Sequence, residues 1–122
     1  MTSHAPPGWP RDVPPPDADE WRSRAVGWLL DLCPADYRGH PVLARHPVAL
    51  ARLAAHHVEA GLEAQRRARA TARERLGDVL PPGAMDEVLE VLDVEQARLL
   101  AARRGVELVE TALRGQRFVP RL

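Results

Sequence analysis

The stretch Leu76–Met85, which reads LGDVLPPGAM, decides the fold of this chain. Gly77 favours the end of a helix, and the run Pro81-Pro82-Gly83 cannot continue one. Proline is absent from 48–80 and again from 83–119. We therefore predict one helix over 48–77 and another over 82–115. Each would be roughly 45 Å long, because an α-helix rises about 1.5 Å per residue.

Apolar residues recur every seven positions in both predicted helices. A seven-residue repeat is typical of two helices that supercoil around each other. Folding the chain at Leu80–Pro81 sets Leu62 beside Leu99. The predicted fold is therefore all-α, an antiparallel two-helix coiled-coil hairpin. The repeat consists of Val48, Ala55, Leu62, Arg69 and Leu76 in the first helix, where Arg69 is the one charged member, and of Met85, Leu92, Leu99, Val106 and Leu113 in the second.

Charge supports the same alignment. Residues 66–76 contain five arginines and one glutamate, a net charge of +4, whereas residues 86–95 contain five acidic residues and no base. The hairpin sets these stretches alongside each other. An exposed ion pair contributes only about 0–1 kcal/mol, but the set favours this register over shifted ones. Gln65 and Gln96 would face each other as a polar layer that fixes the alignment.

The N-terminal part is predicted to divide into a tail and a short helix. Residues 1–16 hold six of the 12 prolines, so we predict a disordered, Pro-rich tail, followed by a single helical domain over 17–122. A helix over 18–33 would be capped by Asp17 and Glu20, end before Pro34 and pack at the open end of the hairpin. The pairs His40-Pro41 and His46-Pro47 each predict a chain reversal followed by a helical start.

Composition restricts the class of protein. The 122 residues suit one domain, and 17 basic residues balance 17 acidic ones, which gives no electrostatic reason to propose a polyanion or an anionic membrane as partner. Every basic residue is Arg, and Ile and Asn are absent, which indicates a high-GC bacterial genome. The single cysteine, Cys33, and the lack of a long apolar segment predict a cytoplasmic protein with no membrane contact.

No motif for catalysis or for binding a cofactor is present, so we predict a non-enzymatic protein without cofactor or metal. Two alternatives remain open. The arginines 66, 67, 69 and 73 could bind nucleic acid, although no aromatic residue lies among them for stacking. A metal-dependent helical-bundle enzyme would use the group His56, His57, Glu59 and Glu63, but the second long helix contains no His. Cys33, at the end of an apolar helix, is predicted to be an unreactive thiol.

A second apolar stripe is the main indication of function. A two-helix hairpin buries one stripe on each helix, so a second stripe requires a partner. We predict a helical interaction or scaffolding protein that forms a homodimer, as a four-helix bundle, or binds another helical protein. The apolar hairpin tip is a second candidate docking point. The predicted interface consists of Val91, Val94, Ala101, Leu108, Gly61, Ala64 and Ala68, and the tip residues are Leu80, Pro81 and Met85.

Overall fold

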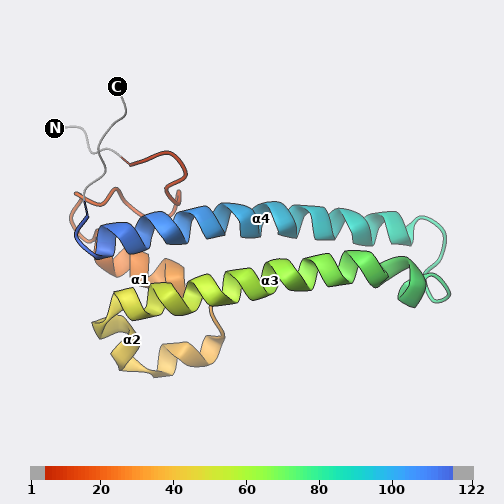
Figure 1. Ribbon diagram of the computed structural model, residues 1–122, viewed down its shortest axis with the longest axis horizontal. Coiled ribbons are helices and arrows are strands. Elements are labelled where there is room, and N and C mark those ends of the chain that lie inside the picture. The colour runs from red at the N-terminus through yellow and green to blue at the C-terminus, as the bar shows by residue number, and fades with distance from the viewer. Residues whose placement is uncertain (1–4, 117–122) are drawn as a thin grey trace.

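Two helices of 30 residues each, α3 (Pro47–Leu76) and α4 (Ala84–Leu113), form the long axis of the molecule. The computed structural model describes residues 5–116, and this part of the chain contains no β-strand. Figure 1 shows α3 and α4 side by side, with the shorter elements gathered at one end. The predicted all-helical hairpin is confirmed. Below, the end that carries the short elements is the basal half, and the part beyond Leu62 and Leu99 is the distal arm.

Proline and glycine set the starts of the helices. The short helix α2 (Pro41–Arg45) and helix α3 each begin at the proline of a His-Pro pair, as predicted. Proline suits the first helical position, where its missing N–H would have no partner inside the helix. Helix α4 starts after Gly83, whose φ of 88° lies in the left-handed region that glycine adopts freely. The predicted range 82–115 was therefore too long at both ends.

Helix α1 (Trp21–Asp31) is shorter than the predicted range 18–33, and a 3-10 turn, η1 (Ala35–Gly39), follows it. The predicted capping box was wrong. Glu20 is itself the N-cap residue, with a φ of 66° and no side-chain hydrogen bond to the helix. The Ser23 hydroxyl instead donates to the Glu20 carbonyl oxygen at 2.9 Å.

The segment 5–16 does not form the predicted disordered tail, because its side chains pack on the helices. Val13 is only 3% exposed and belongs to the basal core. The Trp9 indole N–H donates to the carbonyl oxygens of Val13 at 2.9 Å and Pro14 at 3.2 Å. Its ring lies 6.0 Å from that of Trp21. The prolines exclude a helix here, but they also stiffen a segment that can then pack with little further loss of entropy.

Three ion pairs between α3 and α4 show the register. Arg52 pairs with Glu110 at 3.1 Å and Glu59 with Arg103 at 3.5 Å. Arg69 pairs with Asp93 in the distal arm. In each pair the two residue numbers add up to 162, one more than predicted from the turn. Leu62 and Leu99 accordingly share one apolar cluster with Val58 and Ala102, as the hairpin requires.

Burial falls steeply along the hairpin. The basal core combines α1, α3, α4 and Val13, with Trp9, Trp28 and Tyr37 packed at its edge. Among residues 63–98, all of which the structure describes, Ala72 alone is buried. The distal arm is therefore two helices in contact, without a third element that would complete a core.

The predicted polar layer does not form a hydrogen-bonded pair. The side-chain oxygen Oε1 of Gln65 is buried without a hydrogen-bond partner among the described residues, and Gln96 is exposed. A buried acceptor without a partner costs about 1–3 kcal/mol.

Candidate interaction surface

In the basal half, α1 and the segment 5–16 cover one side of the hairpin. This covered side, the basal face, consists of Leu50 and Ala54 on α3 and of Gly105 and Leu108 on α4, all buried. A Cβ added to Gly105 would lie 2.9 Å from Cη2 of Trp28. One added to Gly8 would lie 3.4 Å from Cδ1 of Leu108. The absence of a side chain at Gly105 lets the indole ring of α1 approach the backbone of α4.

Leu50 and Ala54 pack together with the buried stripe of α1. Both belong to the same apolar cluster as Ala25 and Leu29, which lie four residues apart and so share a helical face. Leu32, just after the end of α1, packs against the next cluster along the hairpin, which contains Leu62 and Leu99. Helix α1 therefore covers the hairpin from its open end as far as the start of this second cluster.

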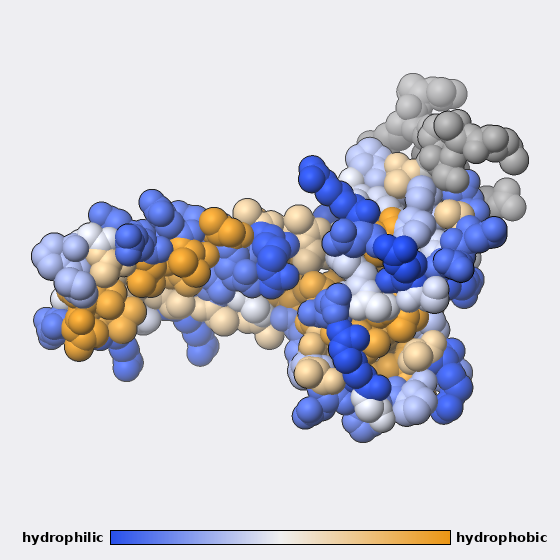
Figure 2. Space-filling model, turned by 180° about the vertical axis from the view of Figure 1, so that it is seen from behind, coloured by the Kyte–Doolittle hydropathy of each residue, from blue (hydrophilic) through white to orange (hydrophobic). Residues whose placement is uncertain are grey.

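The distal arm has a surface at the same heptad positions as the basal face, but no other element within residues 5–116 covers it. A shift of 14 residues toward the turn converts the basal face into Ala64, Ala68, Val91 and Val94, which we call the distal face. Fourteen residues are two heptads, so each residue keeps its side of the hairpin. All four side chains are exposed, and Val91 and Val94 keep 66% and 71% of their surface. Figure 2 shows hydrophobic side chains gathered along the arm.

Five of the seven predicted interface residues are exposed. They are Ala64, Ala68, Val91, Val94 and Ala101. Leu108 was wrongly predicted, because the segment 5–16 covers it and leaves it only 5% exposed. Gly61 is half-buried, and a Cβ added there would lie 3.2 Å from Cδ1 of Leu99. Gly61 thus supports the contact between α3 and α4.

The next heptad step toward the tip replaces apolar residues by charged ones. Arg75 lies seven residues beyond Ala68 on α3, and Glu87 lies seven residues before Val94 on α4. Both side chains are exposed, and neither has an ion pair within residues 5–116. The distal face is therefore flanked near the tip by an arginine on one helix and a glutamate on the other. From the sequence, both charges were expected to pair within the chain.

Arg98 also lies on this side, between Val91 and Gly105 in the heptad series. Its guanidinium Nε donates to Oε2 of Glu95 at 2.9 Å. This hydrogen bond lowers the pKa of the Glu95 carboxyl below its ordinary value, and the carboxylate in turn raises the pKa of Arg98. The charge of Arg98 is therefore already compensated within α4.

The Arg-rich stretch is partly neutralised, but mainly within α3 and not by residues 86–95 as predicted. Arg66 and Arg67 both pair with Glu63 on the same helix, at 2.9 Å and 3.4 Å. Arg69 alone reaches α4, where it contacts Asp93 and donates to the Leu89 carbonyl oxygen at 3.2 Å. Arg73 and Arg75 have no ion pair with any described residue. The two oppositely charged stretches do lie alongside each other, but a single ion pair joins them.

The hairpin tip is a less defined surface. Leu80 and Met85, two of the three predicted tip residues, are half-buried, and Pro81 is exposed. Val79 has the largest apolar exposure there, at 70%. The N–H groups of Val79 and Leu80 both donate to the Leu76 carbonyl oxygen. The tip therefore exposes one valine, whereas the distal face combines two valines and two alanines.

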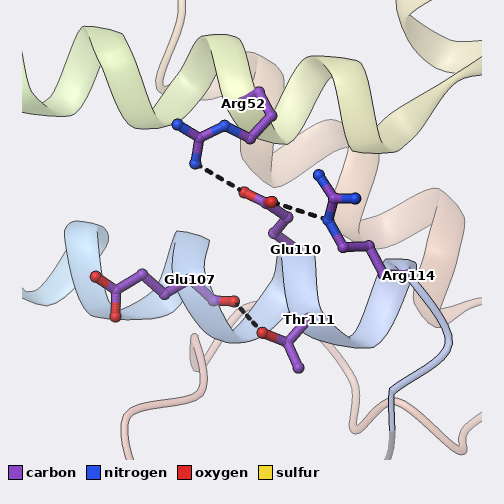
Figure 3. Close-up of polar contacts among 5 residues, drawn as sticks. All are labelled: Arg52, Glu107, Glu110, Thr111 and Arg114. Carbon is purple, nitrogen blue, oxygen red and sulfur yellow. Dashed lines mark hydrogen bonds and ion pairs between the residues drawn. The ribbon is translucent and has the colours of Figure 1, made fainter.

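Polar contacts hold the open end of the hairpin together (Figure 3). The Glu110 carboxylate bridges the two long helices, since it accepts from Arg52 at 3.1 Å and from Arg114 at 3.0 Å. The Thr111 hydroxyl donates to the Glu107 carbonyl oxygen at 2.9 Å. All of these contacts therefore have a structural role in the hairpin.

The residues of the metal alternative do not converge on one site. Among the described residues, no three His, Cys, Asp or Glu side chains come close enough to hold a metal ion. His57 instead shares a hydrogen bond of 2.8 Å with the Tyr37 hydroxyl. This bond ties η1 to α3, which gives His57 a structural role in the basal half.

A polar cleft of about 470 Å³ lies beside α1. Its two arginines are occupied, because Arg38 pairs with Asp31 and Arg24 donates to the Asp12 carbonyl oxygen at 3.3 Å. The cleft therefore lacks convergent free polar groups that would orient a ligand. It is lined by Asp12, Ser23, Arg24, Gly27, Trp28, Asp31 and Arg38.

Cys33 is partly buried at the edge of the basal core. Burial raises the pKa of its thiol above the ordinary value, because the thiolate is poorly solvated there. A raised pKa lowers the fraction of reactive thiolate at neutral pH.

Comparisons with protein families, curated proteins and solved structures find no match to the chain. Within residues 5–116, no helix is both long and apolar enough to cross a membrane.

Proposed function

We propose that this chain is a non-enzymatic helical interaction or scaffolding protein whose distal arm packs against a helix of another molecule. That molecule is either a second copy of the chain, as in a coiled-coil four-helix bundle, or a different helical protein. One observation carries the proposal: Val91 and Val94 are exposed, although they lie two heptads from Gly105 and Leu108, which are covered.

Physical chemistry supports this function. Exposing two valines without a partner forgoes the burial of apolar area, which stabilises by about 25 cal/mol per Å². Ala64 and Ala68 opposite them let a helix backbone approach closely. A surface of this kind next to a covered equivalent is typical of a protein–protein contact.

Site-specific photocrosslinking tests the function. A photoreactive residue at position 94 is compared with one at position 79, which is equally exposed but lies outside the distal face. In cells of the source organism, position 94 should yield a protein adduct in much higher amount than position 79. The mass of the adduct distinguishes a second copy from another protein. No adduct at either position, together with a monomeric mass of the purified chain at about 1 mM, would contradict the proposal.

A second candidate is nucleic-acid binding through the arginines of α3. The observation in its favour is that Arg73 and Arg75 have no ion pair among the described residues, although Arg66, Arg67 and Arg69 do. Binding of this kind weakens steeply with salt. No mobility shift of DNA or RNA at 50 mM salt, even at high protein concentration, would remove this candidate.

A further inference from the structure

We propose that the distal face binds one amphipathic helix of a different protein, laid in line with α1. The bound helix has acidic residues toward Arg75 on α3 and basic residues toward Glu87 on α4. This inference rests on the proposed interaction function and names the kind of partner.

The first argument is continuity with the contact that α1 makes. The basal face accepts one helix, α1, through Ala25, Trp28 and Leu29, and the segment 5–16 covers the remaining part at Leu108. The distal face is the same surface moved by 14 residues, or about 21 Å along the hairpin. Leu32, just after the end of α1, packs against the cluster of Val58, Leu62, Leu99 and Ala102, and the distal face begins beyond this cluster. A second helix placed there would extend the three-helix arrangement of the basal half along the arm.

The second argument is steric, and it concerns a second copy of the chain. Helix α1 already occupies the space over the basal face, so two copies cannot face each other with their arms parallel. An antiparallel pair related by a two-fold axis avoids this collision. Such a pair sets α4 against α4 and α3 against α3. It would bring residues 86–95, with five acidic side chains and no base, against their own copy.

The third argument is charge complementarity. Arg75 and Glu87 stand on opposite sides of the distal face at about the same level, and neither is ion-paired within residues 5–116. Glu90 adds a further unpaired carboxylate on the α4 side. A helix with one acidic flank and one basic flank would compensate both sides. A uniformly charged helix would compensate one and be repelled by the other.

The test uses three synthetic 21-residue helical peptides with the same Ala/Leu seam. One peptide has an acidic and a basic flank, one has two acidic flanks, and one has two basic flanks. Each is titrated into the full chain, and backbone amide NMR signals are followed. We expect the mixed-flank peptide to bind at least tenfold more tightly than the other two. It should shift the amide signals of Val91 and Val94 and those of Ala64 and Ala68.

Two matched variants test whether Arg75 lies beside the bound helix. Arg75→Glu makes both flanks acidic, so it should shift the preference to the peptide with two basic flanks. Arg73→Glu changes an arginine that is also exposed but that the heptad series puts on the other side of α3, and it should leave the preference unchanged. Val94→Arg should abolish binding of all three peptides, whereas Val79→Arg should not.

Each remaining outcome overturns the inference. If no peptide shifts the amide signals of the distal face at 1 mM, this face does not accept a helix. If all three bind equally, the charge assignment is wrong. If the chain proves to be a dimer whose distal faces cover each other, the single-helix partner is wrong. In that last case the proposed interaction function stands, so the two failures are distinguishable.

Discussion

Leu50 in the basal half and Leu92 in the distal arm lie in the same pair of long helices, but their surroundings differ. Leu50 is fully buried beneath α1, whereas Leu92 is half-buried in a seam that is open on both sides. The difference arises from a third layer, supplied by α1 and the segment 5–16. The pairing of α3 with α4 alone thus leaves side chains partly exposed to solvent, and a third helix completes their burial. Stability is therefore expected to concentrate at the basal end.

The largest expected effect comes from deleting side chains at the two ends of the hairpin. Leu50→Ala should lower the free energy of unfolding by about 3 kcal/mol, because it removes a fully buried leucine and leaves a cavity. Leu92→Ala should cost about 1 kcal/mol, because its side chain is already partly exposed and its site can collapse. Urea denaturation followed by circular dichroism measures both. Equal losses would show that the arm is as well packed as the base.

The next effect concerns the close approach of α1 to α4. Gly105→Ala should destabilise by about 1–3 kcal/mol, since the new Cβ would lie 2.9 Å from Trp28 and 3.1 Å from Pro10. Gly27→Ala is the matched control, because nothing lies within 4 Å of a Cβ at that position of α1. It should stabilise by about 0.5–1 kcal/mol through helix propensity. Tryptophan fluorescence during denaturation reports both variants. A neutral Gly105→Ala would mean that α1 does not sit against α4.

A smaller effect is expected from the contact between η1 and α3. Tyr37→Phe keeps the ring but removes the hydrogen bond of 2.8 Å to His57, so it should cost about 1 kcal/mol. His56→Ala changes the neighbouring exposed histidine and should alter stability by less than about 0.5 kcal/mol. Thermal denaturation at pH 7.5 compares the two. If both variants had the same stability, the Tyr37 hydroxyl would contribute nothing to the basal half.

The smallest effect is a pH dependence in the distal arm. Arg98 lowers the pKa of Glu95 in the folded state, so this interaction stabilises the fold above the ordinary Glu pKa of about 4.3. The contribution is lost as the pH falls through the lowered folded value. It should amount to a few tenths of a kcal/mol, because solvent screens both groups. In Arg98→Ala, NMR titration should show the pKa of Glu95 moving up toward its ordinary value. An unchanged pKa would exclude Arg98 as the cause.

The hairpin could be predicted because its determinants are local and repeated. The heptads and the Pro81-Pro82-Gly83 break agree on one register, and the pair of Arg69 with Asp93 lies within one residue of it. The covering of the basal face could not be predicted in the same way. The prolines of residues 5–16 indicate only that the backbone cannot form a regular helix there. They give no periodic pattern from which the packing of Trp9 and Val13 could be predicted. Leu108 was assigned to the exposed stripe for that reason.

The distal face was half predictable on the same physical grounds. Heptad spacing identified Val91 and Val94 as residues outside the seam, and both are exposed. Spacing could not show that Gly61 faces Leu99, because that depends on how closely the two helices approach. Nor could counting charges show that Arg75 and Glu87 remain unpaired, since side-chain reach across two helices is a property of the folded molecule.

The two-heptad displacement between the basal face and the distal face has a consequence for the length of the molecule. Removing seven residues from α3 and seven from α4 at the same level would leave every remaining side chain opposite its present neighbour. Such a matched deletion would shorten the hairpin by about 10.5 Å. The length of the distal arm can therefore change by whole heptads, while the packing of the basal half stays unchanged.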